Sequence, residues 1–229
     1  MTQPRFDVYG SVHKGLRSLM TEIMYELGKS DVNNTSELTA LGEKLGYLWD
    51  ILYVHAQGEE EFIFPHLKIK NETFYMKLKL AHEKFEKDAD NFRKSFKELS
   101  GMDMGTAEKQ ERITKFTKRY NTFVSEYFSH MQDEELEANP ILWGMLDDEE
   151  LMEILSNMSQ KPTVELREYF LPYLVRATNP TERVGVLMGM RRSMSETEFN
   201  GTLRIAKTSL IESDWQKLKQ TLDNLIQVH

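Results

Sequence analysis

Apolar residues recur at alternating steps of three and four along four long stretches of the first 140 residues. This spacing places them on one face of an α-helix, so each stretch predicts a helix that buries one side. The first expected helix covers about residues 6–27, and the second runs from Thr35 or Ser36 to about Phe62. The third covers about Glu72 to Leu99, and the fourth covers about Thr106 to Glu137. Because the connections are short, including one at Met102 to Gly105, the pattern predicts an all-α, up-down-up-down four-helix bundle over residues 1–140.

Proline marks two of the predicted helix ends. Pro65 follows the second stretch, and Asn139-Pro140 follows the fourth. Proline lacks a backbone N–H and clashes with the preceding turn of a helix. We therefore expect the second helix to end or kink at Pro65 and the fourth to end at Asn139-Pro140.

After residue 140 the predicted helices become shorter. We expect them at roughly 148–158, 163–176, 180–191, 196–209 and 214–227. Ser195 with Glu198, and Ser213 with Gln216, fit the capping-box pattern at a helix start. Asn179-Pro180 fits an N-cap followed by proline at the first helical position. Residues 141–229 are therefore predicted to form a second domain, a C-terminal helical appendage.

Charge and composition argue against several classes of protein. The net charge of −8 argues against a nucleic-acid partner, which would need a basic face. No apolar run approaches the ~18 residues of a membrane span. The N-terminal residues lack an apolar signal segment, so we expect a cytoplasmic protein. Since the chain has no cysteine, any metal must be bound through nitrogen and oxygen.

Each predicted bundle helix carries one histidine on its apolar face. Because neighbouring helices alternate in direction, the first and third begin at the end of the bundle where the second and fourth finish. At ~1.5 Å per residue, the four histidines all fall within about 5 Å of one level. These residues are His13, His55, His82 and His130. We therefore predict one layer of four imidazoles in the core.

Two carboxylates join this layer. Glu59 and Glu134 each follow a histidine by four residues, so they share its helix face. A buried carboxylate is costly unless it is paired, hydrogen-bonded or bound to a metal. Nitrogen and carboxylate ligands suit iron, manganese or zinc, and carboxylates can bridge two ions. A lone histidine on an apolar face is usually an ordinary core residue, and the acidic run around Glu134 could be a solvated surface. The agreement of all six positions favours a two-metal site.

In order and spacing, these residues resemble the hemerythrin-like, or HHE cation-binding, family over roughly residues 5–140. The resemblance implies a non-haem di-iron centre with two oxo- or hydroxo-bridged iron ions. By that analogy His13 and His55 would bind one iron and His82 and His130 the other. Glu59 and Glu134 would bridge the two ions.

The chain departs from the oxygen-carrying hemerythrins at two positions. Those proteins have a further histidine four residues after the first on the third helix, where this chain has Glu86. They also use an aspartate five residues after the last histidine, where this chain has Glu135. The four-histidine, two-glutamate pattern is more similar to bacterial hemerythrin-like proteins and to di-iron proteins linked to iron–sulfur repair and iron sensing. Glu86 either completes the shell of the second iron or is a solvated residue beside it. His66 is either a surface residue or an additional ligand.

The resemblance implies binding of a small diatomic or peroxide ligand (O2, NO or H2O2) in sensing, stress protection or iron handling. One alternative is a di-iron oxidase, peroxidase or nitric-oxide reductase, favoured if Glu86 binds the metal. Another is an iron- or redox-responsive module whose appendage contacts a protein partner. We expect neither a nucleic-acid nor a membrane partner. Manganese and zinc stay open as metals because they accept the same ligands.

Overall fold

The computed structural model describes residues 5–101 and 105–227, which are predominantly helical and include no strand. The connection predicted at Met102 to Gly105 lies largely outside these residues. By their contacts the residues fall into two compact units. One comprises Met1–Ser18 with Met145–His229, and the other comprises Leu19–Gly144. The helix α1 (Gly10–Lys29) starts in the first unit and ends in the second. The predicted domain boundary after residue 140 stays a prediction.

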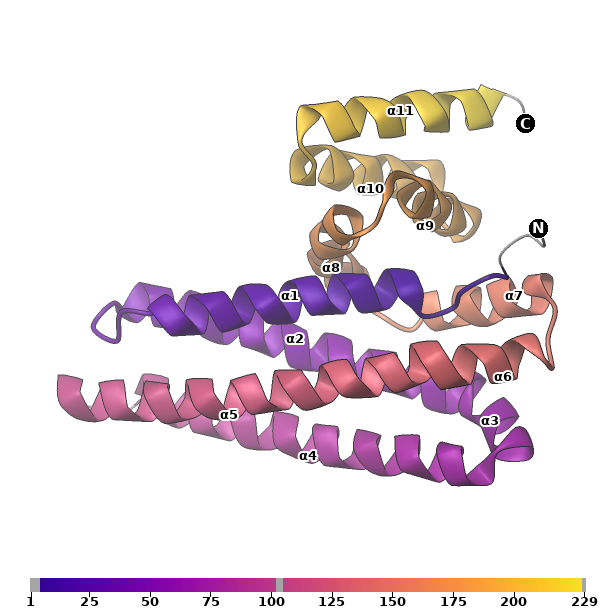
Figure 1. Cartoon of the computed structure of the whole chain (residues 1–229). Helices are drawn as coiled ribbons and strands as arrows, with labels where there is room; N and C mark the ends of the chain where they lie inside the picture. Colours follow the sequence, from indigo (N-terminus) through magenta and orange to yellow (C-terminus); the bar gives the residue numbers. More distant parts are fainter. Residues whose placement is uncertain (1–4, 102–104, 228–229) are drawn as a thin grey trace. The chain divides into compact units, whose positions relative to one another are not determined.

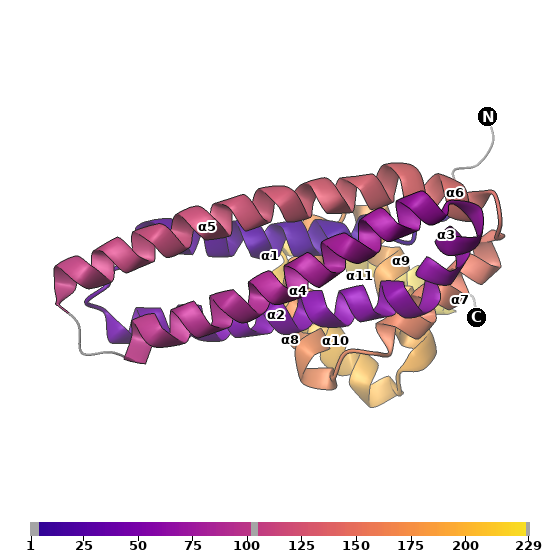
Figure 2. The same ribbon diagram turned by 90° about the horizontal axis from the view of Figure 1, so that it is seen from below.

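The Leu19–Gly144 unit is built from long helices. In both views α2 (Thr35–Phe62), α4 (Glu72–Gly101), α5 (Thr106–Asp133) and the second half of α1 lie side by side (Figures 1 and 2). The short α3 (Phe64–Lys70) joins α2 to α4. The residues on the predicted apolar faces are buried, among them Leu41, Leu45, Leu48, Leu78, Phe92, Ile113, Phe116 and Phe123. The all-α helical bundle predicted from the sequence is confirmed.

Specific contacts join these helices. The Tyr120 hydroxyl of α5 donates a hydrogen bond to the Met20 carbonyl of α1, at 3.2 Å. On α2, the Trp49 ring stacks on Phe92 of α4, with 5.4 Å between ring centroids. Trp49 also makes a T-shaped contact with Phe123 of α5, with 5.3 Å between ring centroids. Large aromatic side chains therefore fill the bundle interior and fix the helices relative to one another.

Two predicted helix boundaries are wrong. The first helix begins at Gly10 and not near residue 6, because the Asp7 carboxylate accepts hydrogen bonds from the N–H groups of Tyr9 and Gly10 at 3.0 and 2.9 Å. The helical path of α5 also continues past Pro140. A π-helix (Glu134–Ala138) is followed by α6 (Asn139–Trp143). Pro140 lies in the first turn of α6, where a missing N–H costs little. At Pro65, by contrast, the predicted break is confirmed, since α2 ends at Phe62.

Shorter helices form the C-terminal part of the other unit. They are α7 (Asp148–Ser159), α8 (Val164–Ala177), α9 (Pro180–Ser193), α10 (Glu196–Ser209) and α11 (Glu212–Gln227). A core of their own includes Val175, Leu187, Phe199, Trp215 and Leu218. The buried Arg183 guanidinium donates hydrogen bonds to the carbonyls of Val175 and Thr178. This part of the chain therefore carries its own packing.

Two of the three helix caps predicted for this part of the chain are confirmed, and one is wrong. The N-cap predicted at Asn179, with Pro180 at the start of the helix, and the capping box predicted at Ser195 are confirmed. The one predicted at Ser213 is wrong, because α11 begins at Glu212 and Ser213 lies inside its first turn. Among the described helices, none is long and apolar enough to cross a membrane.

Candidate metal centre

Four helices position the predicted ligands. His55 and Glu59 occupy successive turns of α2, and His130 of α5 is followed one turn later by Glu134, the first residue of the π-helix. His82 lies on α4 and His13 on α1. His13, Glu59 and Glu134 are fully buried at 0% exposure, and the other three are at most 9% exposed. The apolar faces of the helices thus bring imidazoles and carboxylates into the protein interior.

These six residues form two groups of three. His13, His55 and Glu59 make up one group, and His82, His130 and Glu134 make up the other. Within each group the potential ligand atoms lie within 4.8 Å of one another. Such convergence of buried nitrogen and oxygen donors is what a metal ion requires.

Imidazole Nε2 atoms face both carboxylates. His55 Nε2 lies 3.2 Å from Glu59 Oε1, and His82 Nε2 lies 3.5 Å from the other oxygen, Oε2. His130 Nε2 lies 3.2 Å and His82 Nε2 3.8 Å from Glu134 Oε1. The Nε2 atoms of His82 and His130 are 3.1 Å apart. Glu59 therefore faces a histidine of each group, as a carboxylate shared between two ions would.

Aromatic rings surround the second group. Phe64 stacks on the His82 ring with 4.9 Å between centroids, and Phe85 meets His130 edge-on at 5.3 Å. Tyr127 also meets His130 edge-on, at 5.8 Å. Burial, together with the nearby charges of Glu59 and Glu134, raises the pKa of Tyr127 well above its ordinary value. These rings keep water away from the imidazoles and strengthen electrostatic interactions among the buried groups.

The two carboxylates also change the protonation of His82. Burial alone would lower its pKa, but hydrogen bonds to Glu134 and Glu60 and the charges of Glu59 and Glu134 raise it to about 10. In the metal-free protein, His82 is therefore an imidazolium at neutral pH and offsets part of the buried negative charge. A metal ion would replace this proton, because a ligand nitrogen must be deprotonated.

Glu60 is a residue of the site that the sequence did not reveal. Its Oε1 lies 2.9 Å from His82 Nδ1, the ring nitrogen that does not face the carboxylate pair. This hydrogen bond from His82 lowers the pKa of Glu60. The two residues are 22 positions apart on different helices, so no local spacing links them. The sequence offers only a general indication of such a residue, because a histidine that binds a metal usually donates the hydrogen of its second ring nitrogen to some acceptor.

Glu86 is the predicted ligand that the structure places elsewhere. It is exposed and belongs to neither group. The inward position one turn after His82 is occupied by Phe85, which is 8% exposed. Of the two interpretations of Glu86, its exposure supports a solvated side chain beside the site and gives no support to a metal ligand. His66 lies on α3, partly exposed, and also belongs to neither group.

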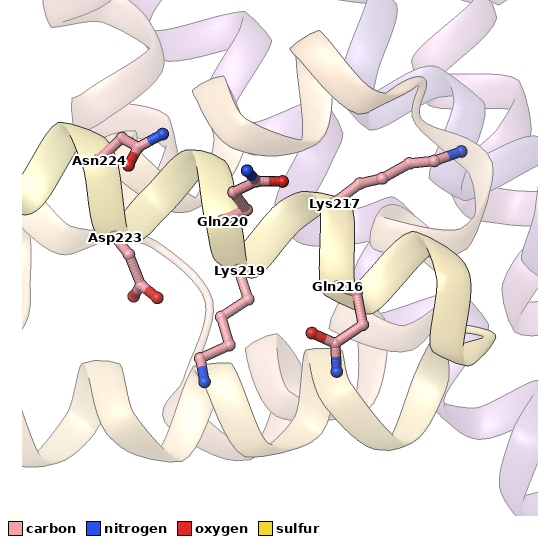
Figure 3. A pocket seen from close by; sticks show the side chains of 6 residues that line it. All are labelled: Gln216, Lys217, Lys219, Gln220, Asp223 and Asn224. Carbon is pink, nitrogen blue, oxygen red and sulfur yellow. The ribbon is translucent and has the colours of Figure 1, made fainter.

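Two pockets lie on the described part of the chain. One, of about 280 Å³, lies beside the second group and is lined by Glu60, Phe64, Pro65, Lys68, Tyr75 and Lys79. Another, of about 410 Å³, is lined by polar side chains of α11: Gln216, Lys217, Lys219, Gln220, Asp223 and Asn224 (Figure 3). Figure 3 shows these side chains extending from a single helix to different sides, so they do not converge on a common point. Of these two pockets, the first adjoins the buried histidines and the second does not.

The donor set fits a metal ion. All six side chains offer imidazole nitrogen or carboxylate oxygen, the ligands that suit iron, manganese and zinc. Their burial keeps solvent from competing for the ions, and the two carboxylates supply negative charge to offset the metal charge. The residues present could therefore hold metal ions in both groups.

Comparison with known proteins agrees with this chemistry. A sequence model of the hemerythrin HHE cation binding domain matches residues 7–142. The F-box/LRR-repeat protein 5 of Mus musculus is 26% identical over 170 residues, which cover 70% of this chain and 23% of the mouse protein. The zinc finger protein BRUTUS of Arabidopsis thaliana is 21% identical over 187 residues, covering 81% of this chain and 14% of the plant protein. The chain thus spans less than a quarter of the length of either relative.

The family match covers more than half of the chain and contains both groups of potential ligands. No solved structure shows a significant match. The chain belongs to the hemerythrin HHE cation-binding domain family.

Proposed function

We propose that this protein binds two iron ions in its helical bundle. His13 and His55 would hold one ion, His82 and His130 the other, and Glu59 and Glu134 would be shared. The observation that carries the proposal is the pair of three-residue groups, each with its donor atoms within 4.8 Å. The positions of Glu59 oxygens opposite His55 and His82 support the shared role.

Iron is proposed first because the family and the donor set both accommodate it. Nitrogen and carboxylate donors also accept manganese and zinc, and metal availability as well as affinity decides which ion a site holds. When bound, two iron ions would supply redox-active positions for a small diatomic or peroxide ligand such as O2, NO or H2O2. We propose sensing, stress protection or iron handling as the use of such binding, and the cytoplasm as its location.

The protein side chains would exclude water from that ligand and orient the histidines that hold the metal. Phe64, Phe85 and Tyr127 pack around His82 and His130 and keep water away from the second group. Glu60 contacts His82 from the side opposite the carboxylates. An oxidase, peroxidase or nitric-oxide reductase would be favoured by Glu86 as a further ligand. Its exposed position removes that support.

Optical spectra of the iron(II)-loaded protein test the ligand proposal. Additions of O2, H2O2 and NO should each change the iron absorption if the buried site admits small ligands. A change that is reversed when the ligand is removed indicates binding. Rapid, lasting oxidation with repeated ligand consumption would instead indicate an enzyme. Absence of any change with all three would contradict the proposed ligand class.

A regulatory module is a second candidate, favoured by the relatives. Similar segments make up only 14% and 23% of two much longer proteins, so such a segment can be one part of a larger protein. In this chain α8 to α11 carry a core separate from the metal residues. We propose that this appendage contacts a protein partner in response to metal. Hydrogen exchange of the full chain with and without iron tests the idea. Changed protection in α8 to α11 would support it, and identical protection would contradict it.

A further inference from the structure

The His82 ring is contacted from both of its nitrogens. Nε2 faces Glu59 at 3.5 Å and the Nε2 of His130 at 3.1 Å. On the other side, Nδ1 lies 2.9 Å from Glu60 Oε1. An ionised carboxylate can only accept a hydrogen bond, so Nδ1 must carry the hydrogen and donate it. Nε2 is then the nitrogen available to a metal.

Two contacts therefore fix the orientation of His82. Phe64 stacks on the ring face, which restricts how far the ring can tilt. Stacking alone does not decide which nitrogen points inward, because a flipped imidazole presents the same apolar face. The hydrogen bond to Glu60 distinguishes the two orientations, since only one of them places Nδ1 against the carboxylate.

We propose that Glu60 is a positioning residue that holds His82 with Nε2 toward the metal and so controls how tightly the second group retains its ion. This inference rests on the proposed function, because it assumes a metal ion held by His82. Glu60 itself does not touch the ion. Hydrogen-bond partners of ligand histidines typically change metal affinity by about 10- to 100-fold when they are removed.

The location of Glu60 makes this role accessible to experiment. Its side chain is 44% exposed and lines the pocket of about 280 Å³ with Lys68 and Lys79. The substitution Glu60→Ala removes the atoms of an acetate ion from the edge of a pocket that solvent reaches. Acetate added to the solution can therefore take the place of the missing carboxylate, beside two lysines that favour an anion.

The experiment measures iron(II) binding by the full-length protein under anaerobic conditions, in competition with a chromogenic chelator. The wild-type protein should bind two ions. Glu60→Ala should bind one of them about 10- to 100-fold more weakly and leave the other unchanged. Glu60→Gln, which keeps an acceptor oxygen and the side-chain volume, should lose less. High acetate should restore the affinity of Glu60→Ala but not that of Glu60→Leu, whose side chain fills the space.

Glu83→Ala is the matched control. Glu83 follows His82 on α4, is exposed, and lies 4.0 Å from Lys79, so its loss removes the same charge from the same neighbourhood. It should bind both ions as the wild-type protein does. Acetate should change neither the wild-type protein nor this control, which shows that the added anion does not act directly on the iron.

Three results would overturn the proposal. The first is wild-type affinity in Glu60→Ala. The second is an equal loss in Glu60→Ala and Glu60→Leu without rescue by acetate, which would assign Glu60 to packing. The third is loss in Glu60→Gln as large as in Glu60→Ala. A wild-type protein that binds no iron would instead contradict the proposed function, so the two failures are distinguishable.

Discussion

The two ends of the Leu19–Gly144 bundle use the same helix faces for different purposes. From the middle of the bundle toward one end, aromatic rings pack together, with 5.4 Å between the centroids of Trp49 and Phe92 and 5.2 Å between those of Phe92 and Phe116. Near the other, the equivalent inward positions carry His55, Glu59 and their partners. Apolar burial stabilises the first end without any ligand. Buried charges at the second are costly unless they are compensated. Stability and metal binding should therefore respond separately to substitutions at the two ends.

The largest effect on stability is expected at the aromatic end. Phe92 is 3% exposed and contacts Trp49 and Phe116, so Phe92→Ala should leave a cavity. We expect it to lower the free energy of unfolding by about 3–5 kcal/mol. Urea unfolding of the metal-free protein measures this loss. The folded fraction should still bind two iron ions, and a lost ion would contradict the separation of the two ends.

Iron itself should stabilise the opposite end. A ligand that binds only the folded state adds about 2.7 kcal/mol at a free concentration 100-fold above its dissociation constant. Thermal unfolding with and without iron(II) measures the increase. His82→Ala should reduce it, whereas His66→Ala should not, because His66 belongs to neither ligand group. An equal increase in both variants would contradict the assignment of His82.

Metal binding should strengthen as the pH rises. His82 in the metal-free protein has its pKa raised from 6.5 to about 10, and the ion must displace that proton. The apparent affinity should therefore rise by about tenfold per pH unit for each proton released. The stability of the metal-free protein should change with pH in the opposite direction. Because the pKa of His82 is raised from 6.5 to about 10 on folding, protonated His82 stabilises the fold fully below pH 6.5, and this stabilisation is lost as the pH rises through about 10. Chelator competition and urea unfolding across this range measure both trends. A pH-independent affinity would contradict proton displacement.

The smallest change in stability is expected when the second group is made apolar. His130→Leu combined with Glu134→Leu removes a buried imidazole and a buried carboxylate, whose Nε2 and Oε1 atoms lie 3.2 Å apart. Replacement of such pairs by apolar residues is often neutral or stabilising. The metal-free double variant should therefore unfold at a urea concentration equal to or above that of the wild type, while it loses one iron ion. A loss of stability as large as that of Phe92→Ala would show that the pair stabilises the fold without metal.

The periodic pattern predicted most of this architecture because helix faces repeat over long stretches. The apolar faces around Leu45, Phe92 and Phe116 are buried as expected. Antiparallel alternation of these faces also placed His82 and His130 at one level, and their Nε2 atoms lie 3.1 Å apart. Features that depend on local irregularity were missed. Nothing in the spacing indicates a π-helix after Asp133, which carries the helical path through Pro140.

The residues of the candidate site could likewise be predicted only in part from the sequence. Glu59 and Glu134 follow histidines at a helical spacing, so the sequence could place them inside. Glu60 contacts His82 across two helices, and the direction of that contact is set by packing, including the Phe64 ring on the imidazole. Glu86 has a helical spacing from His82 but lies beside the inward face, which Phe85 occupies. A shift of one residue around a helix therefore separates a candidate ligand from a solvated side chain.

Iron content of the purified, reconstituted full-length protein tests the central claim most directly. After anaerobic loading and removal of excess metal, we expect two iron ions per chain. His55→Ala and His130→Ala, which alter different groups, should each retain fewer than two, while His66→Ala should retain both. If the wild-type protein binds no iron, or if His55→Ala and His130→Ala each keep two ions, the proposed two-metal centre is contradicted.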